Sequence, residues 1–150
     1  MARSARRRQQ TLALKFSSIT QSVTVKAGPD QVFDAYMDSK KHAAVTGSPA
    51  KMSSAVGGNF TAWEGYIHGK NLKLVKGKRI LQEWSTTEWP KGYPPSLLEI
   101  TLTKTKGGTR LKMVHSKVPA EQRDDYAQGW RDYYWKPLKA YFESNRQGEA

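Results

Sequence analysis

The sequence contains no cysteine and few histidines, namely His42, His68 and His115. Without thiols the chain has no disulfide, no thiolate nucleophile and no cysteine-based metal site. The histidines do not stand in the H-x-x-x-H or H-E-x-x-H spacing of metal-binding helices, and no G-x-S-x-G elbow or phosphate-binding loop is present. We therefore expect no cofactor, no metal and no catalytic residues, and a binding domain rather than an enzyme.

Long apolar runs are also missing. No stretch approaches the roughly 18 apolar residues of a membrane span. The segment from Thr11 to Phe16 is interrupted by Lys15 and is too short for the core of a secretory signal. These absences favour a cytoplasmic location. Import into an organelle is the alternative, because the N-terminus is rich in arginine and free of acids.

What the sequence does have is an excess of positive charge. It holds 25 lysines and arginines against 13 acidic residues, a net charge of +12. Residues 1–15 contribute +5 and contain no acid, which leaves +7 for the rest of the chain. We expect a basic disordered arm over residues 1–17, one domain over residues 18–146 and a short tail over residues 147–150.

This charge restricts the kinds of partner. It favours an acidic protein, because complementary charge accelerates association. Nucleic acid bound through the arm is the weaker alternative, since no zinc-finger, helix-turn-helix or aromatic RNA-binding motif accompanies the basic residues. The basic residues of the domain itself are spread around the expected turns, where hairpins carry solvated side chains. A role for residues 1–15 and an oligomeric state do not follow from the sequence.

Hydrophobic periodicity divides the chain into three parts. Residues 19–26 alternate as a half-buried strand, and an apolar stripe at helical spacing follows Gly28 and Pro29. A second short helix is expected over residues 39–45. Beyond it the period becomes two, which is typical of an antiparallel sheet with short turns. The expected strands cover residues 51–56, 59–64, 67–75, 79–87, 98–103 and 109–118.

A long helix is expected over residues 120–144, after Pro119 ends the sheet. Its apolar stripe consists of Tyr126, Trp130, Tyr134, Leu138 and Tyr141, broadened by Tyr133, Pro137 and Phe142. Pro137 lacks a backbone donor and predicts a kink or an open hydrogen bond. A long helix held in a curved sheet would bury both apolar faces, so the fold class is α+β.

Five motifs in order resemble a known family, the small domain related to activators of the 90-kDa heat-shock chaperone ATPase. This family lies in the START-like or SRPBCC superfamily, which has the helix-grip fold of the birch-pollen allergens. The resemblance covers about residues 19–143. The first motif is the strand and helix from Val23 to Met37, and the second, a central hairpin, is Gly57 to Phe60 with Glu64-Gly65 and Ile67 to Gly69. The third, a strand and its loop, is Trp84 with Trp89-Pro90 and Gly92, and the fourth, the last hairpin, is Gly108 to Leu111 with His115 and Val118-Pro119. The fifth, in the long helix, is Gly129 to Tyr134 with Leu138-Lys139 and Phe142.

The resemblance implies a curved antiparallel sheet of six to seven strands around the long C-terminal helix, with two short helices after the first strand. It also implies a stress-response role through a chaperone partner. Eukaryotic activators carry a separate N-terminal domain that this chain has no room for, so the chain resembles their C-terminal domain alone. A carrier of hydrophobic ligands, or a cofactor-free cyclase or hydrolase, is the alternative within the superfamily.

A helix-grip fold often leaves a cavity between sheet and helix, which could hold a hydrophobic small molecule. The candidate wall residues are Trp84, Met113, His115, Tyr126, Trp130 and Tyr134. The alternative is that these side chains simply fill the core. His115 stands in strand phase with Leu111 and Met113, and a histidine satisfied by hydrogen bonds is expected there more than a general base.

Overall fold

The computed structural model describes residues 14–149, with side chains described as far as Glu143. Most of the expected basic arm, residues 1–13, lies outside the described residues, and so does the nucleic-acid hypothesis that depends on it. The strands are β1 (Phe16–Val25), β2 (Ala50–Met52), β3 (Asn59–Ala62), β4 (Ile67–Val75), β5 (Arg79–Thr86), β6 (Ser96–Thr105) and β7 (Gly108–Pro119). The helices are α2 (Pro29–Met37), α3 (Ser39–Thr46), η1 (Ala120–Gln122), α4 (Arg123–Trp130), η2 (Arg131–Trp135) and α5 (Lys136–Glu149).

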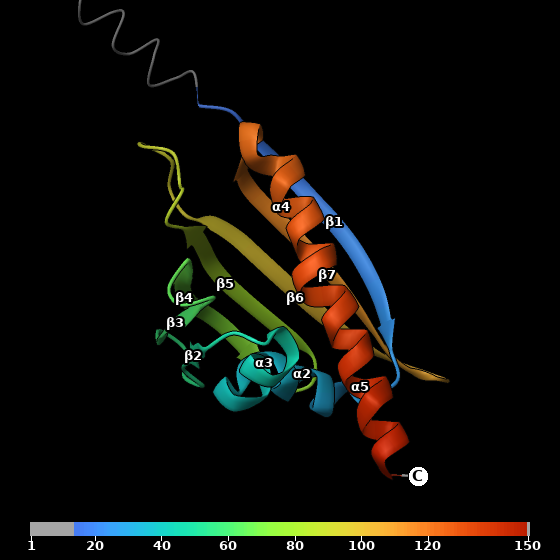
Figure 1. Cartoon of the computed structure of the whole chain (residues 1–150). Coiled ribbons are helices and arrows are strands. Elements are labelled where there is room, and N and C mark those ends of the chain that lie inside the picture. The colour runs from blue at the N-terminus through green and yellow to red at the C-terminus, as the bar shows by residue number, and fades with distance from the viewer. Residues whose placement is uncertain (1–13, 150) are drawn as a thin grey trace, which may run out of the picture.

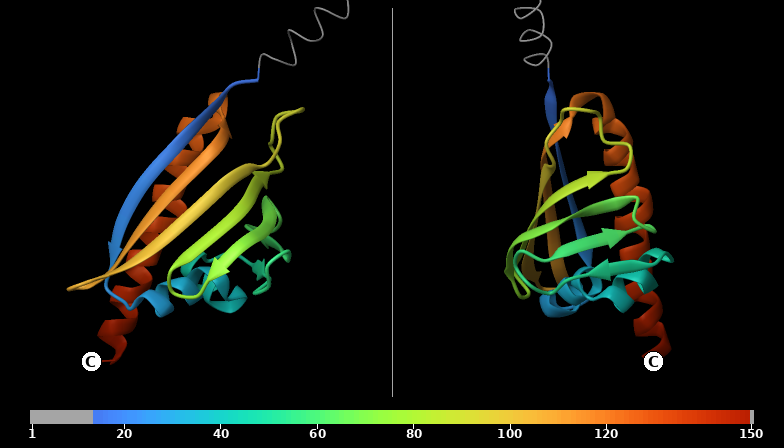
Figure 2. Two further views of the ribbon diagram at one scale, coloured as in Figure 1. Left: turned by 180° about the vertical axis from the view of Figure 1, so that it is seen from behind. Right: turned by 90° about the vertical axis from the view of Figure 1, so that its left-hand side faces the viewer.

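The seven strands form one antiparallel sheet in the order β1-β7-β6-β5-β4-β3-β2. Every neighbouring pair follows in sequence except β1, which pairs with β7 and places the first strand beside the last. The sheet curves, and the chain from α4 to α5 crosses its concave side as one long helix (Figures 1 and 2). This α+β arrangement is the helix-grip fold, as expected.

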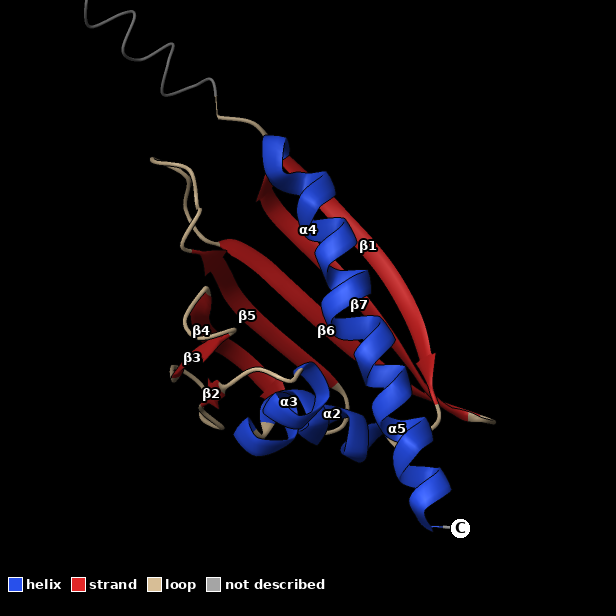
Figure 3. Ribbon diagram, viewed as in Figure 1, coloured by secondary structure: helices blue, strands red, loops and turns tan. Residues whose placement is uncertain are grey.

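The two short helices begin and end where local signals place them. At the start of α2, the Gln31 side chain accepts a hydrogen bond from the Gly28 backbone N–H (2.9 Å), and Pro29 occupies the first turn. Asp38 caps α3 by accepting from the Lys41 backbone N–H (3.0 Å). Figure 3 shows both helices against the lower end of the long helix, where they close one end of the sheet.

Strand β2 is shorter than expected, covering Ala50–Met52 rather than residues 51–56. The amide of Asn71, a fully buried residue of β4, donates to the backbone oxygens of Ser53 (2.7 Å) and Ala55 (3.1 Å). These bonds draw the chain away from the ladder, so the residues after Met52 form a turn. At the other end of the sheet, β1 begins at Phe16, earlier than the expected residue 19.

The long helix contains an irregularity just before Pro137. Residues Arg131–Trp135 form π-helical turns, in which the Lys136 backbone N–H reaches back to the Arg131 oxygen. Such a bulge is one way to accommodate a proline that cannot donate and whose ring crowds the preceding turn. It also shifts the buried face: Trp135 is buried, whereas Tyr133, expected within the apolar stripe, is 57% exposed.

The core lies between the concave side of the sheet and the helices. It includes Ile19, Ile80, Leu98, Ile100 and Met113 from the sheet, each essentially without exposed surface. Burial of such side chains stabilises the fold by about 1.5–3 kcal/mol each. None of the helices within residues 14–149 is long and apolar enough to cross a membrane.

Candidate ligand-binding pocket

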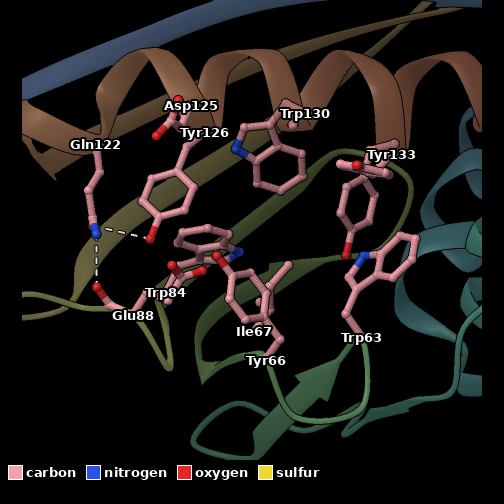
Figure 4. A pocket seen from close by; sticks show the side chains of 12 residues that line it. Trp63, Tyr66, Ile67, Trp84, Glu88, Gln122, Asp125, Tyr126, Trp130 and Tyr133 are labelled. Carbon is pink, nitrogen blue, oxygen red and sulfur yellow. Dashed lines mark hydrogen bonds between the residues drawn. The ribbon is translucent and has the colours of Figure 1, made fainter.

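A pocket of about 480 Å³ opens between the first half of the long helix and strands β4 and β5 (Figure 4). Its size falls within the range of roughly 300–1,000 Å³ that small-molecule sites occupy. The wall is dominated by aromatic rings, namely Trp63, Tyr66, Trp84, Tyr126, Trp130, Tyr133 and Tyr134. The remaining lining residues are Ile67, Glu88, Gln122, Asp125 and Gly129.

The rings pack on one another at the base of the pocket. Trp84, on β5, lies 5.2 Å from Tyr126 and 5.8 Å from Trp130 between ring centroids. Trp130 in turn lies 4.7 Å from Tyr134, one helical turn further on. Tilted and edge-on pairs at these distances stabilise each other beyond their buried area. The base is therefore a rigid aromatic surface.

The turn between β3 and β4 closes one end of the pocket with a strained backbone. Trp63, Glu64 and Gly65 have successive φ values of 54°, 57° and 88°. A bulky residue rarely adopts this left-handed conformation, which costs about 1–3 kcal/mol per residue. The turn places the Trp63 ring 5.4 Å from Tyr133 across the pocket.

The opposite end of the pocket is polar. The hydroxyl of Tyr126 is bonded to Thr86 Oγ1 (2.7 Å) and donates to Gln122 Oε1 (3.1 Å). Gln122 Nε2 donates to the backbone oxygen of Glu88 (2.8 Å). Burial, together with a hydrogen bond to the Glu88 carboxylate, raises the pKa of Tyr66 well above its ordinary value. Burial also raises the pKa of Tyr126, so both phenols are neutral at physiological pH.

A buried histidine forms a hydrogen bond with the hydroxyl of Tyr134 on the side away from the pocket. His42 Nδ1 bonds the backbone oxygen of Tyr36 (2.7 Å), so it carries the proton, and Nε2 accepts from the Tyr134 hydroxyl (3.1 Å). The Trp63 ring packs edge-on against the same tyrosine, with the ring centroids 6.5 Å apart. Burial lowers the pKa of His42. The neutral imidazole thus holds the wall and has no free nitrogen for catalysis.

His115 lies beneath the pocket in the closed core. Its Nδ1 accepts from the indole N–H of Trp130 (3.1 Å), so Nε2 carries the proton and donates to Ser96 Oγ (2.7 Å). Ser96 in turn donates its hydroxyl proton to the backbone oxygen of Trp84 (2.7 Å). Burial lowers the pKa of His115 to about 3, and the ring stays neutral.

The six candidate wall residues divide into two groups. Trp84, Tyr126, Trp130 and Tyr134 line the pocket, whereas the fully buried Met113 and His115 do not. The last two stand in the correct strand phase, but the rings of Trp84 and Trp130 pack against His115 and separate it from the open space.

Several residues that line the pocket were not predicted from the sequence. Trp63 and Tyr66 enter from a turn, and Tyr133 enters because the π-helical turns carry it out of the core. The only sequence signal for the first two was the Glu64-Gly65 pair, which marks a turn without indicating where its aromatic neighbours point. No trio of His, Asp or Glu suited to a metal occurs among the described residues.

One polar atom in the wall has no partner. The indole nitrogen of Trp84 is buried and forms no hydrogen bond within the described part of the chain. Leaving such a donor unpaired costs about 1–3 kcal/mol. Its ring is only 3% exposed and stands among the lining side chains of Figure 4.

Comparison with known proteins places this geometry in a family. In sequence, the chain is 28% identical over 124 residues to human activator of 90 kDa heat shock protein ATPase homolog 1, covering 83% of this chain and 36% of the human protein. The chain thus spans about a third of the length of the curated relatives it matches.

Solved structures show the same fold. An HSP90 activator from Plasmodium falciparum has a TM-score of 0.74 at 22% identity, over 84% of this chain and 94% of its own. A protein from Chromobacterium violaceum has a TM-score of 0.67 at 26% identity, over 84% and 96%. Residues 26–143 match the family described as Activator of Hsp90 ATPase homolog 1-like protein. Because that match spans most of the chain, the protein belongs to this family, within the SRPBCC superfamily.

Proposed function

We propose that this domain binds an apolar small molecule in the aromatic pocket between the long helix and the sheet. The observation that carries the proposal is the pocket itself: about 480 Å³ remain open above Trp84 and Trp130. In a domain that used these rings only as core, the helix would close onto the sheet. A concave, mostly apolar space with a few polar groups at one end is the common form of a small-molecule site.

Two features of the wall support this proposal. The left-handed backbone at Trp63 costs stability, and such strain is typically retained at functional sites. The unpaired indole N–H of Trp84, buried at the base of the pocket, is a second cost. The second cost is not offset by any hydrogen bond among the described residues.

Gly129 offers a test that preserves the fold. It lies in α4 and lines the pocket, and a Cβ added there would meet nothing nearer than the Tyr133 ring at 3.9 Å. Gly129→Leu places a branched side chain in the open space while raising helix propensity. Gly129→Ala is the matched control, because it raises propensity and leaves most of the space free.

The neutral fluorophore N-phenyl-naphthylamine serves as the probe, followed by its emission and by quenching of tryptophan fluorescence. We expect the unmodified protein and Gly129→Ala to bind it and Gly129→Leu to lose at least tenfold in affinity, about 1.4 kcal/mol. Equal binding by all three proteins, or binding by none, would refute the proposal.

A second candidate function is regulation of a 90-kDa heat-shock chaperone, and it rests on the family. The human relative is named for activating that ATPase, although the similarity covers 36% of its length. With a net charge of +12, this chain would meet an acidic surface quickly and in a salt-dependent manner. Titration with the chaperone at low and high salt, followed by an ATPase assay, tests this function. Absence of binding at low salt would exclude it.

A further inference from the structure

The sign of the charge around the pocket is opposite to that of the chain. Its charged side chains are Glu88 and Asp125, and no lysine, arginine or histidine of the described part lines it. Over the whole chain, basic residues outnumber acidic ones by 25 to 13. A pocket that shared the general bias would present cations. This one presents carboxylates only.

These carboxylates come from two elements. Glu88 follows β5, and Asp125 stands in the first turn of α4; Figure 4 shows both at the end of the pocket that also holds Gln122 and Tyr126. Neither forms a salt bridge within the described residues. Glu88 lies close enough to the Tyr66 phenol to help raise its pKa. The acidic end of the pocket therefore carries two carboxylates, both on exposed residues and neither in a salt bridge in the described part of the chain.

The aromatic wall has the same preference. The face of an indole or phenol ring carries negative electrostatic potential and attracts cations, above all those with a weakly hydrated quaternary ammonium. The Tyr66 and Tyr126 rings stand beside the acidic end, and the Trp63 ring closes the opposite end of the pocket. An anionic ligand would face two carboxylates and negative ring faces together.

Building on the proposed binding function, we infer that the ligand is an amphipathic cation. Its apolar body occupies the space above Trp84 and Trp130, and its ammonium head lies between the tyrosine rings and the carboxylates of Glu88 and Asp125. The net charge of the chain attracts anions instead, but screening limits that effect to about 8 Å at physiological salt.

Three probes with one apolar group separate these contributions: phenylbutyltrimethylammonium, its neutral analogue with a tert-butyl group in place of the ammonium, and phenylpentanoate. Titration calorimetry on the full chain should give an affinity for the ammonium roughly tenfold higher than for the neutral analogue. The carboxylate should bind more weakly than either. Gly129→Leu should weaken all three.

A double variant, Glu88→Gln with Asp125→Asn, removes the local charge and retains the shape. It should bring the ammonium close to the neutral analogue, whose own affinity should not change. Glu121→Gln with Asp124→Asn removes the same number of charges and is the control, because both residues, Glu121 in η1 and Asp124 in the first turn of α4, are exposed and outside the pocket wall. The control should retain the preference.

The outcomes distinguish this inference from the function on which it rests. Equal affinity for ammonium and neutral analogue, tighter binding of the carboxylate, or an equal loss in both double variants would overturn the cation inference and leave a pocket that binds apolar molecules. No binding of any probe would overturn both.

Discussion

The indole N–H of Trp130 donates to Nδ1 of His115 over 3.1 Å, so the helix that lines the pocket is tied to the strand beneath it. The bond fixes the tautomer, because an indole can only donate. A proton added to Nδ1 would face that donor and would have no acceptor. Acid therefore acts on the contact that holds α4 against β7.

Stability should fall as the pH falls from neutrality. The pKa of His115 is 6.5 in an unfolded chain and about 3 in the folded protein, so the unfolded state binds the proton first. The stability that depends on the neutral ring is complete above pH 6.5 and is lost progressively toward about pH 3. The slope reaches at most about 1.4 kcal/mol per pH unit for each such histidine. Burial lowers the pKa of His42 as well, which acts in the same direction.

His115→Gln provides the comparison for this prediction, because its amide can accept from Trp130 and donate to Ser96 but does not titrate. Urea unfolding between about pH 7 and pH 4.5 should show a flatter dependence for the variant. Parallel curves for the two proteins would mean that other groups cause the acid sensitivity.

The two tryptophans at the base of the pocket should differ in their cost of replacement. Trp84 and Trp130 are each 3% exposed, but only the indole N–H of Trp130 has a partner. Trp130→Phe removes ring volume and leaves His115 without its donor, whereas Trp84→Phe removes volume and an unpaired N–H. We expect Trp130→Phe to cost roughly 1–2 kcal/mol more in the free energy of unfolding. Equal losses in denaturant unfolding would contradict this.

Gly69 is required by close packing in the middle of β4. It pairs with Phe60 on one side and Trp84 on the other. A Cβ there would overlap the Glu83 backbone oxygen and come within 2.7 Å of the Phe60 ring. Gly69→Ala should therefore cost about 1–3 kcal/mol or more, as overpacking does. Gly107→Ala, where a Cβ meets nothing within 4 Å, should unfold at nearly the denaturant concentration of the unmodified protein.

Glu64 allows the strain at the β3–β4 turn to be measured. Its side chain is exposed and its φ is 57°, a value that glycine adopts without cost. Glu64→Gly should raise the free energy of unfolding by up to about 1 kcal/mol, since relief of strain exceeds the added entropy of the unfolded chain. Glu64→Ala removes the carboxylate and keeps the strain, so a similar gain from it would rule out the backbone explanation.

The fold was predictable because its signals are local. Alternation in the strands, the helix start at Gly28 and Pro29 and the apolar spacing of Trp130, Tyr134 and Leu138 each depend on neighbours within a few residues. Paired with the family motifs, they predict the order of elements. The strand boundary at Met52 was not predictable, because it depends on an asparagine in another strand.

The candidate pocket was predictable only in part, because its wall depends on contacts between distant residues. Strand phase predicted that His115 points inward, but which inward residue lies under a ring and which faces open space is decided across the fold. Trp63 lies in the pocket because of an unusual backbone conformation, which periodicity does not report. The exposed position of Tyr133 depends on a local change in helical hydrogen bonding.

That change, the π-helical segment Arg131–Trp135, lies between two halves of the long helix that face different parts of the fold. One residue added to a turn of an α-helix rotates everything after it by about 100° around the helix axis. The half before the segment presents Trp130 to the pocket, and the half after it presents Leu138 to the core beside α3. A single residue gained or lost within the segment would reset the rotational phase between them. The phase of this segment therefore determines which side chains of the long helix face the pocket and which face the core.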